Sequence, residues 1–132
     1  MIPKFRAWDK EFKEMVQVDA LVFDGQIIKA TYKNGNVVKE DLKNYVLMQS
    51  TGMLDKNWRE IFEGDIIAIE VDDTGTPINA RIFQNRKIGV LMFHVFEDNE
   101  DVPMVELLED DLVTFEIIGN IWEHPELAEV KQ

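Results

Sequence analysis

The sequence predicts a mainly β protein, with an N-terminal antiparallel β meander followed by a C-terminal SH3-like β-barrel or roll. Two features of the pattern predict this class. Short runs of β-branched and aromatic residues alternate with polar segments. Some of these segments contain Asp-Gly or Asn-Gly, which tolerate the positive φ of tight hairpin turns. An apolar fraction of 45% and a charged fraction of 30% are typical of a folded chain.

The first part of the chain reads as strand and turn in repeated succession. Its turn signals are Asp9-Lys10-Glu11, Asp24-Gly25 and Asn34-Gly35-Asn36. The expected strands lie near residues 3–8, 14–23, 26–33 and 36–40.

A domain boundary is expected after a further short strand at 45–49. Ser50-Thr51-Gly52 and the polar Asp55-Lys56-Asn57 follow this strand, which predicts domains at 1–52 and 53–132. Residues 53–62 are expected to form one helical turn or an irregular loop. The helical alternative rests on the spacing of Leu54, Trp58, Ile61 and Phe62.

The second part again alternates apolar runs with polar loops. Glu63-Gly64-Asp65 precedes the first run, and five short strands would suffice for a small closed barrel that leaves few bare edges. The polar tail after Pro125 is expected to carry one helical turn or to fray. The expected strands are 65–71, 80–84, 87–96, 102–108 and 114–122.

Composition excludes several classes of site. The chain has no cysteine, which removes disulfides, thiolate nucleophiles and cysteine-based metal sites and is typical of a reducing compartment. No apolar run is long enough for a signal peptide or a membrane span. We therefore expect a cytoplasmic protein with no membrane association.

Charge is distributed unevenly. Residues 1–60 carry ten basic and nine acidic residues, a net charge of +1, whereas residues 61–132 carry four and seventeen, a net charge of −13. The acidic part would repel a phosphate backbone, so direct nucleic-acid binding is disfavoured. The lysines of the first part are interpreted as a solvated strand surface.

Asp73-Thr74-Gly75 resembles the catalytic tripeptide of aspartic proteases, and Ile117-Ile118-Gly119 resembles the apolar pair and glycine that pack beneath it. In a dimer, two such aspartates would share one proton. The surroundings disfavour this hypothesis, because Asp72 precedes the tripeptide where an apolar strand end is required. A polar turn is the preferred interpretation.

An acidic stretch is the candidate interaction patch. It does not fit a Ca²⁺ loop of the EF-hand type, since Pro103 falls where that loop needs glycine. It could meet a basic protein partner, mimic a phosphate backbone towards a DNA-binding protein, or only increase solubility. The patch consists of Glu97, Asp98, Glu100, Asp101, Glu109, Asp110 and Asp111.

No catalytic, cofactor-binding or metal-binding residue is predicted. His94 and His124 are far apart and neither has a metal-ligand spacing. Phosphate loops, nucleophile elbows and acid–base pairs at a defensible spacing are not found. An enzymatic role is therefore disfavoured.

Four blocks of the sequence, taken in order, are specific enough to compare with known families. The blocks are Pro3-Lys4-Phe5-Arg6-Ala7-Trp8-Asp9; Leu47-Met48-Gln49-Ser50-Thr51-Gly52 with Asp55-Lys56-Asn57; Glu60-Ile61-Phe62-Glu63-Gly64-Asp65-Ile66; and Ile118-Gly119-Asn120-Ile121-Trp122-Glu123 with Pro125-Glu126-Leu127. Together they resemble the YopX family of small proteins encoded by phages and prophages of Gram-positive bacteria. One departure is Trp58, which stands where the family's usual turn has glycine.

The resemblance implies a β-rich fold with an SH3-like later part, a homo-oligomer, and no established activity or catalytic residues. Our working hypothesis is a phage-derived accessory protein of the bacterial cytoplasm that binds itself and a host or phage protein. The rivals are a nucleic-acid-linked regulator or DNA mimic and, more remotely, an aspartic protease acting through Asp73.

Overall fold

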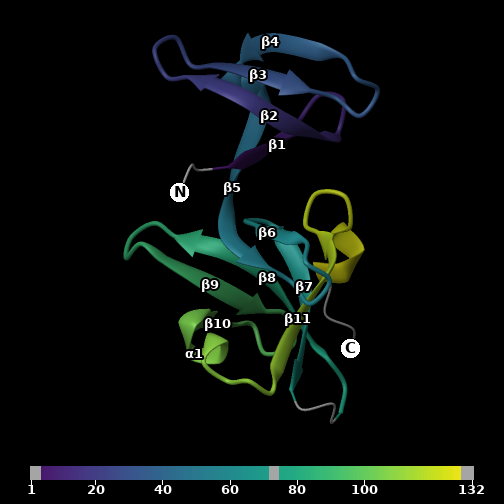
Figure 1. Ribbon diagram of the computed structural model, residues 1–132, viewed down its shortest axis with the longest axis vertical. Coiled ribbons are helices and arrows are strands. Elements are labelled where there is room, and N and C mark those ends of the chain that lie inside the picture. The colour runs from purple at the N-terminus through teal and green to yellow at the C-terminus, as the bar shows by residue number, and fades with distance from the viewer. Residues whose placement is uncertain (1–3, 72–74, 129–132) are drawn as a thin grey trace. The chain divides into compact units, whose positions relative to one another are not determined.

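The computed structural model describes residues 4–71 and 75–128, and strands dominate them (Figure 1). Packing divides the chain into a first unit, Met1–Ser50, and a second unit, Thr51–Gln132. The expectation of a mainly β protein is confirmed. The predicted domains, 1–52 and 53–132, would each fold independently, and this stays a prediction.

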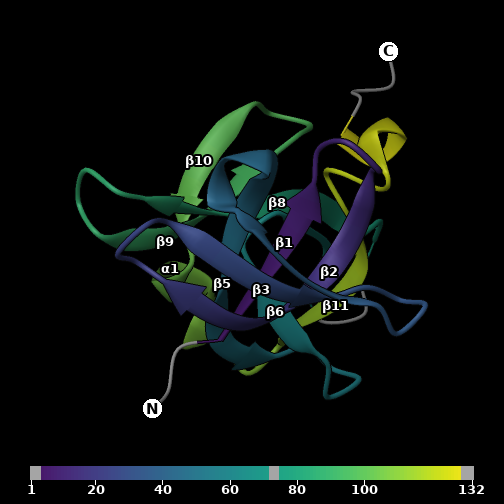
Figure 2. The same cartoon turned by 90° about the horizontal axis from the view of Figure 1, so that it is seen from above.

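The first unit is an antiparallel sheet in the order β4-β3-β2-β1-β5. Figures 1 and 2 show β2 and β3 side by side within it. A 3-10 turn, η1 (Leu42–Asn44), connects β4 to β5. The strands are β1 (Phe5–Asp9), β2 (Glu14–Val22), β3 (Ile27–Thr31), β4 (Val37–Asp41) and β5 (Tyr45–Leu54), the last residues of β5 belonging to the second unit.

Turn chemistry places these strands as the sequence predicts. The Asp9 carboxylate accepts hydrogen bonds from the backbone N–H groups of Glu11 and Phe12, which closes the β1–β2 turn. Gly25 (φ 95°) and Gly35 (φ 91°) adopt positive φ in the next two turns. Both predicted glycine turns are confirmed.

The core of the first unit lies on one face of its sheet. Alternate residues of each strand point to the same face, so Val16 of β2 and Ala30 of β3 share it with Ala7 of β1. Ile28 and Tyr45 complete the buried cluster. Burial of this apolar face is the main driving force for forming the sheet.

The second unit contains an antiparallel sheet in the order β10-β9-β8-β7-β11. The short strand β6 precedes it and pairs with β5 in the strand order of the other sheet. Helix α1 (Val105–Leu108) and the 3-10 turn η2 (Pro125–Ala128) complete this unit. The strands are β6 (Glu60–Phe62), β7 (Asp65–Val71), β8 (Ile78–Asn85), β9 (Val90–Val95), β10 (Glu100–Pro103) and β11 (Val113–Asn120).

Strand β7 is buried from Asp65 to Ile69, which explains its continuous apolar run. Ile67 and Ile69 face a cluster that includes Ile82 and Phe93. The Phe93 and Phe115 rings pack with their centroids 5.4 Å apart. The core of the second unit therefore forms mainly around β7.

The closed SH3-like barrel expected for residues 53–132 is not found. The sheet is open among the described residues, with β10 and β11 at its two edges. Strand β10 is four residues long and ends at Pro103, which has no N–H group to donate to a ladder. The chain leaves the sheet there, before it could pair with β11.

The strand expected at 102–108 is wrong beyond Pro103, because α1 occupies 105–108. Met104 is buried and Leu107 packs against the same core. This spacing of three is helical, whereas a strand would bring Glu106 to the side of Met104. The helical period was present in the sequence but is too short to stand out.

The helical turn considered for residues 53–62 is also wrong. Strand β5 continues through Ser50-Thr51-Gly52 to Leu54, with Gly52 at φ 78°. A turn follows, and residues 60–62 form β6. The apolar spacing seen in the sequence therefore reflects two strands joined by a turn.

Candidate functional site

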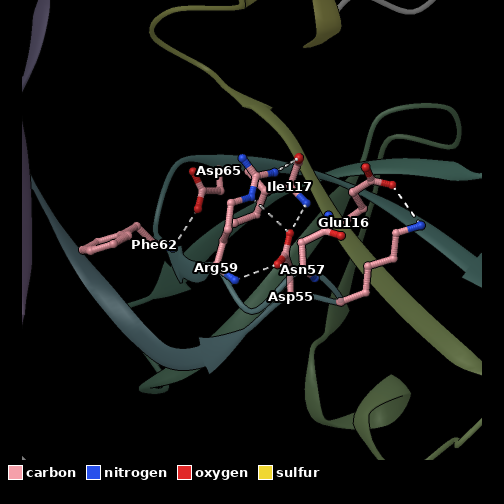
Figure 3. Close-up of polar contacts among 8 residues, drawn as sticks. Asp55, Asn57, Arg59, Phe62, Asp65, Glu116 and Ile117 are labelled. Atoms are coloured by element: carbon pink, nitrogen blue, oxygen red, sulfur yellow. Dashed lines mark hydrogen bonds and ion pairs between the residues drawn. The ribbon is translucent and has the colours of Figure 1, made fainter.

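The buried carboxylate of Asp55 organises the turn between β5 and β6 (Figure 3). Its Oδ1 accepts hydrogen bonds from the backbone N–H groups of Asn57 and Arg59, each at 2.9 Å. Its Oδ2 accepts one from the N–H of Ile117 on β11 at 3.0 Å and lies 3.6 Å from Nε of Arg59. The carboxylate thus joins the turn to β11.

Electrostatics keep Asp55 ionised. Burial by itself would raise the pKa of this carboxyl group. The three backbone N–H groups, aided by the Arg59 guanidinium, outweigh burial and hold the pKa below its usual value. Because both oxygens are occupied and the proton affinity is low, Asp55 is suited to holding the turn and poorly suited to proton transfer.

Two further buried polar residues also hold turns. Asp65 accepts a hydrogen bond from the N–H of Phe62 across Gly64 (φ 86°), as Figure 3 shows. Asn120 Oδ1 accepts from the N–H groups of Trp122 and Glu123. These side chains therefore stabilise the entry to β7 and the exit from β11.

The segment around Gly119 is closely packed. The register of β11 against β7 shifts between Ile117 and Gly119, which places a β-bulge at this point. A Cβ atom at Gly119 would lie 2.7 Å from Nδ1 of His124. That nitrogen accepts a hydrogen bond from the N–H of Asn120 at 3.2 Å. His124 is thereby assigned a structural role.

His94 takes part in a row of side chains across three strands. It lies opposite Arg81 on β8 and Asp101 on β10, and its Nδ1 is 2.7 Å from Asp101 Oδ1. The Arg81 guanidinium lies 4.9 Å from the Phe83 ring centroid. Among residues 4–71 and 75–128, no cluster of metal-ligating side chains is found.

The acidic patch lies on two segments. Glu97, Asp98, Glu100 and Asp101 belong to the β9–β10 hairpin, and Glu109, Asp110 and Asp111 follow α1. All seven residues are exposed. Asp101 contacts His94, and Asp110 accepts a hydrogen bond from the N–H of Leu112 at 2.9 Å. The interaction role of the patch stays a prediction.

Exposed apolar residues lie close in sequence to Glu109, Asp110 and Asp111. The sequence analysis did not predict that these apolar residues are exposed. Val105, Leu108 and Leu112 are 43 to 56% exposed. Reading residues 102–108 as a strand hid their common exposure. The spacing of Met104 and Leu107 was the signal that could have revealed it. We call residues 105–112 the acidic–apolar segment.

Trp58 was also missed as a candidate binding residue. Its side chain is 82% exposed, and its backbone has φ 64° in the left-handed region. Bulky residues rarely adopt this conformation. The departure from glycine noted in the sequence was the available signal.

The protease hypothesis falls partly beyond the described structure. Asp73 and Thr74 lie outside the described residues, while Gly75 has φ 84°. Ile117 and Gly119 flank the bulge of β11 and pair with β7.

Within the part of the chain that is described, no helix has the length and hydropathy to cross a bilayer.

Comparison with known proteins identifies relatives over nearly the whole chain. Residues 4–129 match a family model described as YopX protein. One similar structure is the crystal structure of protein EF1440 from Enterococcus faecalis, with 28% sequence identity and a TM-score of 0.62. The similarity covers 98% of this chain and 99% of that chain. The structure of protein yopX from Bacillus subtilis is 21% identical, with a TM-score of 0.63, over 96% and 98%. No match was found among curated proteins.

Proposed function

The chain belongs to the YopX family, and on this premise we propose that it is a non-enzymatic, protein-binding accessory protein. The proposal includes a phage or prophage gene, a cytoplasmic location and self-assembly. Each of these was implied by the resemblance or the composition. The binding role has support of its own in the side chains of the second unit.

The acidic–apolar segment is the observation that carries the proposal. Its exposed Val105, Leu108 and Leu112 alternate with the carboxylates of Glu106, Glu109, Asp110 and Asp111. Apolar side chains supply contact area in an interface, while charges select and steer the partner. The segment fits a partner protein with a basic rim around an apolar patch.

Trp58 supports the same function at a second point. Tryptophan is among the residues that contribute most binding energy in protein interfaces. Its exposure leaves the indole ring available for such a contact. The occupied oxygens of Asp55 and the turn roles of Asp65 and Asn120 favour a binding role over catalysis.

The test is affinity capture from host cells that produce the tagged protein. The binding variant combines Leu108→Ser, Glu109→Gln, Asp111→Asn and Leu112→Ser. The control combines Glu11→Gln and Asp24→Asn, which remove the same number of charges from exposed positions of the first unit. We expect one specific protein to bind the wild type and the control, to be released by salt, and to be lost by the variant.

Other outcomes would contradict the proposal. Equal capture by the binding variant would exclude the acidic–apolar segment. A gel shift with DNA that weakens steeply with salt would favour a nucleic-acid regulator. Peptidase activity at acid pH that disappears in Asp73→Asn would favour the protease. Light scattering that gives a monomer at all concentrations would exclude self-assembly.

A further inference from the structure

A pocket of about 360 Å³ lies in the first unit, and none of its lining residues belongs to the Asp55 turn or to the acidic–apolar segment. Two aromatic rings, Phe12 and Tyr32, and two carboxylates, Glu14 and Glu40, contribute to its wall. Asn34, Asn36 and Val38 also line it. These residues come from the β1–β2 turn, β2, the β3–β4 turn and β4, and β3 lies between β2 and β4 in the sheet.

Hydrogen bonds hold the wall in place. The Tyr32 hydroxyl donates to Asp9 Oδ2 and lies 2.6 Å from the Tyr45 hydroxyl, which donates to Glu40 Oε2 at 3.0 Å. Asp9 Oδ1 accepts from the N–H of Phe12 at 3.1 Å, which fixes the turn that carries this ring. A preorganised wall loses little conformational entropy when a ligand binds.

The lining residues define the charge of the pocket. The tyrosines are neutral, because burial and, for Tyr32, the hydrogen bond to Asp9 raise their pKa. The charged groups among the lining residues are Glu14 and Glu40. Within the described residues, the Glu14 side chain has no hydrogen-bond or ion-pair partner. The two carboxylates therefore give the pocket wall a negative charge.

We propose that this pocket binds the guanidinium group of an arginine side chain on a partner protein. Guanidinium is planar, so it stacks on aromatic rings and pairs with carboxylates through several N–H donors. An ammonium group carries the same charge but is not planar. The carboxylates exclude anions by repulsion.

The surroundings favour a protein as the source of the cation. Phe12, which lines the pocket, is 71% exposed. Apolar surface beside the pocket provides contact area for a chain that carries the arginine. The pocket lies in the first unit, so this inference is independent of the acidic–apolar segment.

The first experiment is an NMR titration of the full chain with N-acetyl-arginine amide. N-acetyl-citrulline amide is the matched control ligand, since it has nearly the same shape and no charge. N-acetyl-lysine amide keeps the charge without the planar group. We expect shifts at the lining residues with arginine, weaker shifts with lysine and none with citrulline at the same concentration. Equal binding of citrulline would overturn the inference.

Variants of the pocket make the test specific. Glu14→Gln should weaken arginine binding about tenfold, because a charge-assisted contact is lost. Asp24→Asn removes one exposed charge from the same unit and should change affinity less than about twofold. Phe12→Ala removes an exposed ring, so folding should persist while affinity falls. Unchanged binding by a folded Glu14→Gln variant, or an equal loss in Asp24→Asn, would refute the site.

A last experiment distinguishes a protein side chain from a free cation as the ligand of the pocket. An arginine flanked by apolar residues in a short peptide should bind more tightly than N-acetyl-arginine amide. Spermidine should bind more weakly than either. Tighter binding of spermidine would overturn the assignment to a protein side chain.

Discussion

Trp58 illustrates a conflict between backbone and side chain at a single residue. The left-handed conformation costs an L-residue about 1–2 kcal/mol, because Cβ approaches the following carbonyl oxygen. The indole is 82% exposed, so little packing offsets this cost. The strain is consistent with a residue that serves binding more than folding.

Trp58→Gly is therefore expected to stabilise the protein by about 1 kcal/mol, because glycine adopts positive φ without a steric penalty. Urea denaturation would measure the change. Trp58→Ala is the matched control, since it removes the ring and keeps Cβ, and it should give no such gain. A destabilised Trp58→Gly variant would mean that the indole packs in solution.

Asp55→Asn is expected to destabilise the protein by about 2–4 kcal/mol, because a buried acceptor with three backbone N–H donors loses one oxygen and its charge. Asp110→Asn, which changes an exposed carboxylate with one such bond, should cost less than about 0.5 kcal/mol. Chemical denaturation at neutral pH compares the two.

The same carboxylate sets a pH dependence. A pKa lowered by folding contributes stability above the ordinary aspartate pKa of about 4, and this stability is lost as pH falls through the folded value. We expect the wild type to lose stability below about pH 4. Asp55→Asn should show a flatter profile in that window. Parallel profiles would mean that other carboxylates control acid unfolding.

At the scale of elements, the two tyrosines link β4 to β5, which are not neighbours in the first sheet. Tyr45 begins β5 and donates to Glu40 on β4, while Tyr32 follows β3. These are the chain's two tyrosines, so tyrosine signals report on this network without background. The network connects elements that are far apart in strand order.

Tyrosinate absorbance should therefore rise only when the first unit unfolds. The raised pKa of both phenols contributes stability that is present below about pH 10 and is lost as pH rises through the folded values. An ultraviolet pH titration with circular dichroism checks this, and the urea-unfolded chain should titrate near pH 10. Smooth ionisation near that pH in a folded protein would contradict it.

At the scale of the whole molecule, the two units differ in net charge. The first carries eight basic and seven acidic residues, a net charge of +1, and the second carries six and nineteen, a net charge of −13. Repulsion among like charges destabilises a compact state. The second unit should therefore be more sensitive to ionic strength.

Raising ionic strength from about 0.01 to 0.15 M shortens the screening length from about 30 to 8 Å. We expect this to stabilise the second unit by on the order of 1 kcal/mol and to leave the first nearly unchanged. Tyrosine signals report on the first unit. In a Trp8→Phe background, tryptophan fluorescence reports on the second. Equal shifts in both signals would contradict the expectation.

The sequence by itself determined the mainly β class, the glycine turns and the family, because these depend on local φ preferences and on residues in order. Only the tertiary structure decided that the second sheet stays open, that α1 replaces a strand, and that Asp55 bonds to Ile117 62 residues away. Those outcomes depend on which distant groups meet. The pocket of the first unit belongs with them, since Phe12, Glu14, Tyr32 and Glu40 become neighbours only when the strands pair.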